Sequence, residues 1–255
     1  MAFFTSASYS NQTQKQTSLL IFIIFTLFHT LFYTAVSVSF NFSTFQPNSN
    51  NLIDFDGDAF SSNGVLLLTK NQLDGSITFS VGRASYDQPV RLWDRRTNKL
   101  TDFTTHFSFV MKAVDPSRFG DGLAFFIAPF DSSIPNNSAG GYLGLFSNES
   151  AFNTKKNQLV AVEFDSFQNT WDPSSDHVGI NVNSIQSVAT VAWKSSIKNG
   201  SVADAWICLS YAIDLRDVLP EFVRIGFSAA TVVDELLTCA SGYNLISTVI
   251  HITTR

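Results

Sequence analysis

Apolar and polar residues alternate with a period of two along much of the chain after residue 37. Three stretches show this alternation most clearly, at 38–45, 106–114 and 177–185. Helical periodicity is almost absent, and the best candidate is about one turn within 214–222. Polar stretches rich in glycine and asparagine predict turns at 54–64, 115–122, 135–141 and 197–200. Many short strands with such turns predict an all-β sandwich or barrel.

The first 37 residues predict a cleaved signal peptide. An apolar run covers 18–33, Lys15 is the only cation before it, and Ala35-Val36-Ser37 follows as a small-x-small cleavage pattern. The alternative is a signal anchor that stays in the membrane. The run is short for a membrane span and contains His29, which favours cleavage. We therefore expect a secreted or vacuolar protein whose single domain is 38–255, with the membrane involved only through the signal segment.

The composition indicates which partners are excluded and what stabilises the fold. The 255 residues include 25 phenylalanines, enough for one large core, and a net charge of −5 argues against a nucleic-acid partner. Sequons at four positions support passage through the secretory pathway: Asn41, Asn136, Asn148 and Asn199. The two cysteines, Cys208 and Cys239, do not form a disulfide framework, so stability must come from the core or from bound metal.

Charged groups gather in residues 160–180, although the chain is otherwise poor in charge. Side chains alternate along a strand, so Glu163 and Asp165 lie on one face while Val160, Val162 and Phe164 lie on the other. Two like charges on one face repel, and burying them without a partner is unfavourable. We therefore expect a cation between them.

Three further ligand-type side chains follow within a dozen residues: Asn169, Asp172 and His177. Oxygen ligands suit Ca²⁺, whereas carboxylates with one imidazole suit Mn²⁺ or a similar transition ion. Each residue alone has an ordinary explanation, since Asp172-Pro173 is a common turn and His177 could be a surface residue at a strand start. Together with Glu163 and Asp165 they favour a metal site.

This window resembles the metal-binding signature of the legume lectins. Other stretches resemble the same family in the same order, at 40–45, 120–129, 140–146 and 219–231. The resemblance implies an antiparallel jelly-roll sandwich with a flat back sheet, a curved front sheet and a small top sheet. It also implies a protein that binds sugars without altering them.

The resemblance implies two metal ions, Ca²⁺ and Mn²⁺. The calcium ligands would be Asp165, the backbone carbonyl of Phe167, Asn169 and Asp172. The manganese ligands would be Glu163, Asp165, Asp172 and His177, with Ser187 joined through water. The metals would fix the loop that contacts the sugar.

Sugar recognition in the family would assign four contacts to this chain: the Asp121 carboxylate, the Gly141 backbone, the Phe167 ring and the Asn169 amide. A hexose of the galactose or mannose class has hydroxyls that donate to a carboxylate and accept from amides, while its C–H face packs on an aromatic ring. The family also implies a cis peptide between Gly120 and Asp121. By itself, the Gly-Asp-Gly stretch at 120–122 would predict a plain turn.

Two stretches depart from the family pattern. After Ile207 the family continues with a hairpin of two more strands, and this chain joins the flanking segments almost directly through Cys208. After Thr231 the sequence 232–255 does not match the usual final strand. We therefore expect a sandwich that lacks two strands and its usual final strand. The β-prone residues 243–254 are expected to cover one exposed sheet edge.

Several other functions fit parts of the sequence. A β-sandwich glycosidase would carry Glu-x-Asp-x-Glu on one strand, but here the third position is Phe167, which has no proton to donate. A defence or storage protein that has lost sugar binding, and the ectodomain of a receptor kinase, are further alternatives. We expect a non-catalytic partner of mono- or oligosaccharides, and the family's oligomers leave a homodimer or a tetramer open.

Overall fold

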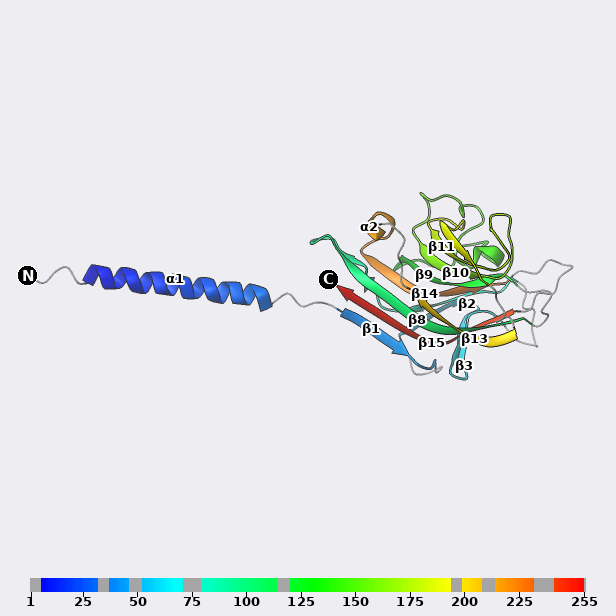
Figure 1. The fold of residues 1–255 in the computed structure, drawn as a ribbon, viewed down its shortest axis with the longest axis horizontal. Coiled ribbons are helices and arrows are strands. Elements are labelled where there is room, and N and C mark those ends of the chain that lie inside the picture. The colour runs from blue at the N-terminus through cyan, green and yellow to red at the C-terminus, as the bar shows by residue number, and fades with distance from the viewer. Residues whose placement is uncertain are drawn as a thin grey trace, which may run out of the picture. The chain divides into compact units, whose positions relative to one another are not determined.

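The computed structural model describes residues 6–31, 37–45, 52–70, 79–113, 120–193, 199–207, 214–231 and 241–254 (Figure 1). The chain divides into two compact units, Met1–Val36 and Ser37–Arg255. The first contains helix α1 (Ser6–Leu31). No helix within the described ranges has the length and apolar character required to cross a bilayer. Cleavage of residues 1–37 stays a prediction.

The second unit consists almost entirely of strands. They are β1 (Ser37–Phe42), β2 (Ile53–Gly57), β3 (Phe60–Ser62), β4 (Val65–Leu67), β5 (Val81–Tyr86), β6 (Val90–Arg91), β7 (Trp93–Asp94), β8 (Lys99–Ala113), β9 (Gly122–Pro129), β10 (Val160–Asp165), β11 (His177–Val182), β12 (Ala189–Ala192), β13 (Asn199–Ile207), β14 (Phe222–Ala230) and β15 (Ser241–Thr254). A 3₁₀ helix η1 (Gly140–Tyr142) and a short helix α2 (Leu215–Val218) interrupt them. The Asp214 side chain accepts a hydrogen bond from the Arg216 amide and so caps α2.

The strands form two antiparallel sheets. The seven-stranded sheet has the order β13-β8-β15-β4-β3, with β1 paired to β15 and β7 to β8. The eight-stranded sheet has the order β12-β11-β10-β9-β14-β5-β2, with β6 paired to β14. This architecture confirms the predicted all-β sandwich.

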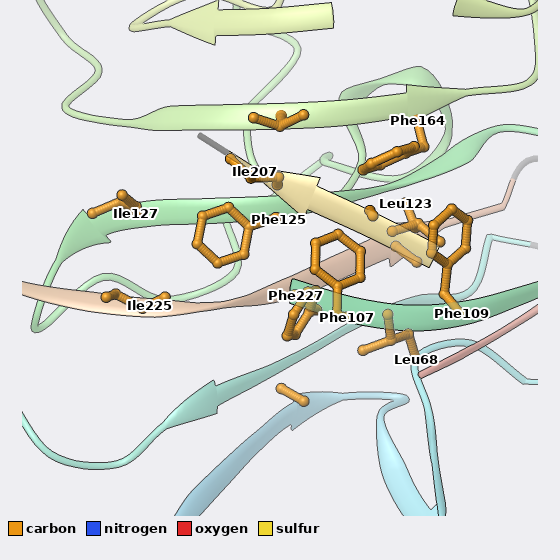
Figure 2. Close-up of a cluster of buried hydrophobic side chains, with 14 of the residues drawn as sticks. Leu68, Phe107, Phe109, Leu123, Phe125, Ile127, Phe164, Ile207, Ile225 and Phe227 are labelled. Atoms are coloured by element: carbon orange, nitrogen blue, oxygen red, sulfur yellow. The ribbon is translucent and has the colours of Figure 1, made fainter. Parts of the chain in front are cut away.

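Aromatic side chains from both sheets fill the space between them. Phe107 of β8 meets Phe164 of β10 and Phe227 of β14 edge to face, with ring centroids 5.8 and 4.8 Å apart (Figure 2). Edge-to-face contacts of this kind add to the gain from burying the rings. This central core accounts for much of the high phenylalanine content.

A second apolar cluster lies on the opposite face of the eight-stranded sheet. Phe126 of β9 and Ala161 of β10 pack there against Leu143, Leu145 and Phe146 of the segment after η1. The strands β9 and β10 are therefore buried on both faces, as their nearly continuous burial shows. This cluster places the loop around η1 against the sheet that carries the acidic residues.

Most of the predicted elements are confirmed. β1, β8 and β11 account for most of each of the three alternating stretches, and α2 lies within 214–222. The prediction of a turn over 54–64 is wrong, because β2 and β3 occupy much of it. These short strands are stabilised by pairing with β5 and β4 rather than by their own polar sequence.

The C-terminal segment holds a different place from the one expected. β15 pairs with β8 on one side and with β1 and β4 on the other, so it lies within the sheet and does not cover an edge (Figure 1). The chain therefore supplies a last strand to this sheet even though 232–255 departs from the family pattern. Residues 208–213 and 232–240, including Cys208 and Cys239, lie outside the described residues.

Within the described residues, β13 pairs only with β8 and β12 only with β11, so each ends its sheet. An apolar groove of about 280 Å³ opens beside them, lined by Val162, Val178, Ile180, Ala189, Thr190, Val191, Trp206 and Ile207. Trp206 is 72% exposed. We call this region the β13 edge. Ile207, after which the sequence predicts the loss of two strands, lines this groove, and the loss itself stays a prediction.

Candidate metal and carbohydrate site

Strands β10 and β11 place the acidic and imidazole groups side by side. Val160, Val162 and Phe164 face the central core, which confirms the predicted alternation. In the antiparallel register Asp165 lies opposite His177, and Glu163 lies opposite Gly179. All four of these residues are buried.

The ligand-type atoms converge. One ligand atom each of Asp165, Asp172 and His177 lies within 4.8 Å of the others. Glu163 joins them through its Oε1 atom, which is 3.2 Å from His177 Nε2. Ser187 donates a hydrogen bond to the same Oε1 atom, which places its side chain beside the predicted manganese ligands. The four predicted manganese ligands therefore form one cluster.

Without a cation, burial and neighbouring negative charges disfavour the ionised carboxylates of this cluster. Burial, together with the nearby charge of Asp172, raises the pKa of Asp165 to about 10. Burial also raises the pKa of Asp172. Burial alone would lower the pKa of His177, but the hydrogen bond and the charge of Glu163 outweigh it and the pKa is raised. A divalent cation would favour the ionised carboxylates and remove this penalty.

The loop after β10 presents the predicted calcium ligands. The backbone N–H of Phe167 donates to Asp165 Oδ1, and the backbone N–H of Asn169 donates to Asp172 Oδ2, each at 2.7 Å. The Asp172 amide donates back to the Asn169 carbonyl at 3.2 Å. Asn169 Oδ1 is buried and accepts no hydrogen bond from the part of the chain that is described. A buried acceptor beside two carboxylates fits a hard cation such as Ca²⁺.

Asp121 lies next to this loop. The peptide bond between Gly120 and Asp121 is cis, as the family resemblance implied. The Asp121 amide donates to the Ala230 carbonyl at 3.1 Å, and the Asp121 carbonyl accepts from both the amide and the hydroxyl of Ser166 at 2.8 Å. A Cβ atom on Gly120 would lie 3.0 Å from the Cβ of Phe167, so the two loops are in close contact.

Gly141 approaches the same loop from η1. A Cβ atom at this position would overlap the Asn169 side-chain amide, so only glycine allows the approach. Phe167 is 39% exposed and presents its ring to solvent. Nearby, Tyr142 stacks on Trp171 with ring centroids 5.4 Å apart. The four predicted sugar contacts, Asp121, Gly141, Phe167 and Asn169, thus come from three segments that meet at one place.

Sequence reasoning missed the residues that tie these segments together. Ser166 directly follows Asp165, and alternation could not show that it binds the Asp121 carbonyl. Gly179 was also missed. A Cβ atom there would collide with both Glu163 and Ser187, so its absence makes room for their contact.

Comparison with known proteins identifies the family. The legume lectin domain matches residues 37–208. Lectin 7 of Medicago truncatula is 45% identical over 244 residues, covering 83% of this chain and 90% of its own. Lectin I-B4 of Griffonia simplicifolia, in its metal-free form, superposes with a TM-score of 0.77 at 38% identity, covering 84% of this chain and 99% of that one. The winged bean acidic lectin, solved with methyl-α-D-galactose, gives a TM-score of 0.75 at 33% identity and covers 86% and 100%.

These relatives are sugar-binding proteins without catalytic activity. They therefore rule out the alternative of a β-sandwich glycosidase. The burial of Glu163 and Asp165, which are 2% and 1% exposed, agrees, since a catalytic pair must reach the substrate. The chain has the fold and the relatives of a carbohydrate-binding protein, and it belongs to the legume lectin family.

Proposed function

We propose that this lectin binds a hexose-containing glycan at Asp121, Gly141, Phe167 and Asn169, and that binding depends on Ca²⁺ and Mn²⁺. The observation that carries the proposal is the contact of the Asp121 and Gly141 loops with one segment, 165–172, which also holds the ligand-type residues.

The residues fit two divalent ions with shared ligands. Asp165, the Phe167 carbonyl, Asn169 and Asp172 would hold calcium, and Glu163, Asp165, Asp172 and His177 would hold manganese. When bound, the ions supply positive charge to the buried carboxylates and fix the conformation of residues 165–172. Asn169 would offer its side-chain Oδ1, which is buried and accepts no hydrogen bond from the described residues, to the cation and its NH₂ group to the sugar.

The proposed sugar contacts follow from the chemistry of these groups. The Asp121 carboxylate accepts hydrogen bonds from sugar hydroxyls, while the Asn169 amide and the Gly141 N–H donate to sugar oxygens. The exposed Phe167 ring packs against the C–H face of the sugar. Relatives and neighbours include a lectin solved with galactose and a lectin named as mannose/glucose-specific, so we propose a hexose of either class.

Two further aspects complete the proposal. We place the protein in the secretory pathway, secreted or vacuolar, because of the apolar run at 18–33 and the sequons, three of which have exposed asparagines at Asn41, Asn136 and Asn148. We also propose a homodimer or tetramer. The alternative of a defence or storage protein without sugar binding is disfavoured because Asp121, Gly141 and Asn169 keep their contacts.

A glycan array tests the metal-dependent function. Purified protein should bind a set of hexose-terminated glycans, lose the signal after chelation and regain it when Ca²⁺ and Mn²⁺ return. Binding that is indifferent to chelation would contradict the metal dependence, and no binding to any glycan would contradict the function itself.

Replacing Asp121 tests the sugar contact. Asp121→Asn should abolish glycan binding, because it removes the acceptor charge, while metal binding measured by calorimetry is kept. Asp131→Asn, at an exposed carboxylate in the loop after β9, is the matched control and should leave binding unchanged. Full glycan binding by Asp121→Asn would show that the sugar lies elsewhere.

A further inference from the structure

The loop that carries Gly141 has an unfavourable backbone just after η1. Leu143 has φ 54° and Gly144 has φ 68°, so two consecutive residues adopt the left-handed conformation. For leucine this conformation is sterically costly, and it persists only where the surroundings hold it. The contacts that hold this conformation also affect the position of Gly141, which lies two residues before Leu143.

Two buried side chains of the eight-stranded sheet bind the carbonyls of these same residues. Arg83 Nε donates to the Gly144 carbonyl at 2.9 Å, and Ser228 Oγ donates to the Leu143 carbonyl at 2.6 Å. Arg83 and Ser228 are direct cross-strand partners on β5 and β14. Both left-handed residues are therefore held by hydrogen bonds from one cross-strand pair, Arg83 and Ser228.

Arg83 is an unusual side chain for this place. It is 2% exposed, and its guanidinium lies 5.0 Å from the centroid of the Phe126 ring within the second apolar cluster. Burial lowers its pKa to about 10, so it is still charged at neutral pH. A buried cation is unfavourable unless its hydrogen bonds compensate, and an apolar side chain of similar length would fill the same space without that penalty. The bond to Gly144 is the specific contact that such a replacement would lose.

The two carbonyls that Arg83 and Ser228 bind are close in the chain to the proposed sugar contact at Gly141. Gly141 lies three residues before Gly144, and the Leu143 amide donates to the Gly140 carbonyl at 2.9 Å, which closes the turn between them. Gly141 in turn has no spare room against the Asn169 amide. A small displacement of the turn therefore changes the distance between Gly141 and Asn169.

We propose that Arg83, together with Ser228, is a positioning residue for sugar binding, which sets the Gly141 backbone against Asn169 by holding the Leu143 and Gly144 carbonyls. The inference rests on the proposed hexose site. Arg83 itself does not contact the sugar, because it is buried beneath the loop.

Arg224 provides a matched control. It lies on β14 in the same sheet, its Nε donates to the Phe130 carbonyl at 2.8 Å, and its guanidinium lies 5.3 Å from the Phe130 ring. It therefore shares with Arg83 a bond from Nε to a loop carbonyl and a contact with a phenylalanine ring, but the loop residue lies eleven positions before Gly141. Arg224 also forms an ion pair with Asp54 at 2.8 Å and donates to Ser85 Oγ at 3.1 Å, so its replacement should cost at least as much stability.

The experiment compares Arg83→Met, Arg83→Lys and Arg224→Met by three measurements on metal-loaded protein: hexose affinity, Ca²⁺ affinity and thermal stability. Arg83→Met should weaken hexose binding by roughly tenfold or more, the effect of losing a charge-assisted hydrogen bond. Arg83→Lys, which keeps a donor, should recover part of that affinity. Arg224→Met should lower the melting temperature and leave hexose affinity unchanged.

The inference is overturned if Arg83→Met and Arg224→Met lose thermal stability alike while both bind hexose as tightly as the wild type. Wild-type protein that binds no hexose would instead refute the proposed function. If Arg83→Met does not fold, Ser228→Ala removes the neighbouring bond with a smaller change. It should weaken hexose binding severalfold, and unchanged affinity would contradict the proposal.

Discussion

Asp165 shows how burial affects the ionisation of a single residue of the cluster. Its pKa is raised to about 10 by burial and by Asp172, whereas an unfolded aspartate titrates near its ordinary value of 3.8. The folded protein therefore holds a proton that the unfolded chain releases. The stabilisation from this proton is complete below about pH 4 and is lost as the pH rises toward 10. The raised pKa of His177 acts in the same direction.

We predict that metal-free protein becomes less stable as the pH rises from 5 to 8. The free energy of unfolding, measured by urea titration in the presence of a chelator, should fall across this range. With Ca²⁺ and Mn²⁺ present the fall should shrink or disappear, because metal binding replaces the proton. Metal-free stability that increases from pH 5 to pH 8 would contradict the assignment. Asp165→Asn, which cannot ionise, should flatten the metal-free profile.

Sequence reasoning predicted the residues of this site better than the contacts among them. Alternation correctly placed Glu163 and Asp165 on one strand face, because the direction of a side chain in a strand is a local property. Ser166, Arg83 and Ser228 were not predicted. Each binds a carbonyl of a distant loop, and the path of that loop is decided by packing across the sheet and not by the neighbouring sequence.

At the scale of elements, half-buried strands were predictable and paired edge strands were not. β8 alternates clearly because one of its faces lies in the central core, and β11 alternates because Val178 and Val182 pack against that core while His177, Gly179 and Asn181 face the other way. β2 and β3 have polar sequences that look like turns, and their strand conformation depends on β5 and β4. The role of β15 depends on pairing as well, since β-prone sequence predicts a strand but not which strands will flank it.

We predict that removing β15 prevents folding. A chain that ends at Thr231 would leave backbone groups of β8, β1 and β4 without their partner along the whole length of that strand, which is strongly destabilising. The truncated protein should lose its cooperative thermal transition and bind a dye specific for exposed apolar surface. A chain that lacks only residues 1–36 is the control and should melt cooperatively. A cooperative transition in the truncated chain would show that β15 is dispensable.

At the scale of the whole molecule, the β13 edge combines exposed apolar side chains with the end of a sheet. The alignment with lectin 7 is 244 positions long, but it includes only 83% of the 255 residues of this chain. Some aligned positions of lectin 7 therefore have no counterpart here. Both sheets end at the groove, and Val202 and Trp206 of β13 are 56% and 72% exposed. Among the strands that the structure describes, none pairs with the outer edge of β13, and an unpaired edge beside an apolar groove promotes association with other strands.

We predict that the protein self-associates through the β13 edge at high concentration. Val202→Lys should reduce the association measured by sedimentation velocity, because a charge on an edge strand opposes pairing. Ser39→Lys, on an exposed position of β1 at another strand of the same sheet, is the control and should leave association unchanged. Equal association of wild type and Val202→Lys would place the contact elsewhere.

Trp206 also gives this region an intrinsic optical signal. The chain has four tryptophans, and Trp93, Trp171 and Trp193 are each partly buried, whereas the Trp206 ring stacks on His106 with most of its surface in water. Its fluorescence should therefore be red-shifted and accessible to a soluble quencher such as acrylamide. A strand that docks beside β13 would shift the emission to shorter wavelengths and protect it from quenching, so occupancy of the groove can be followed without a label.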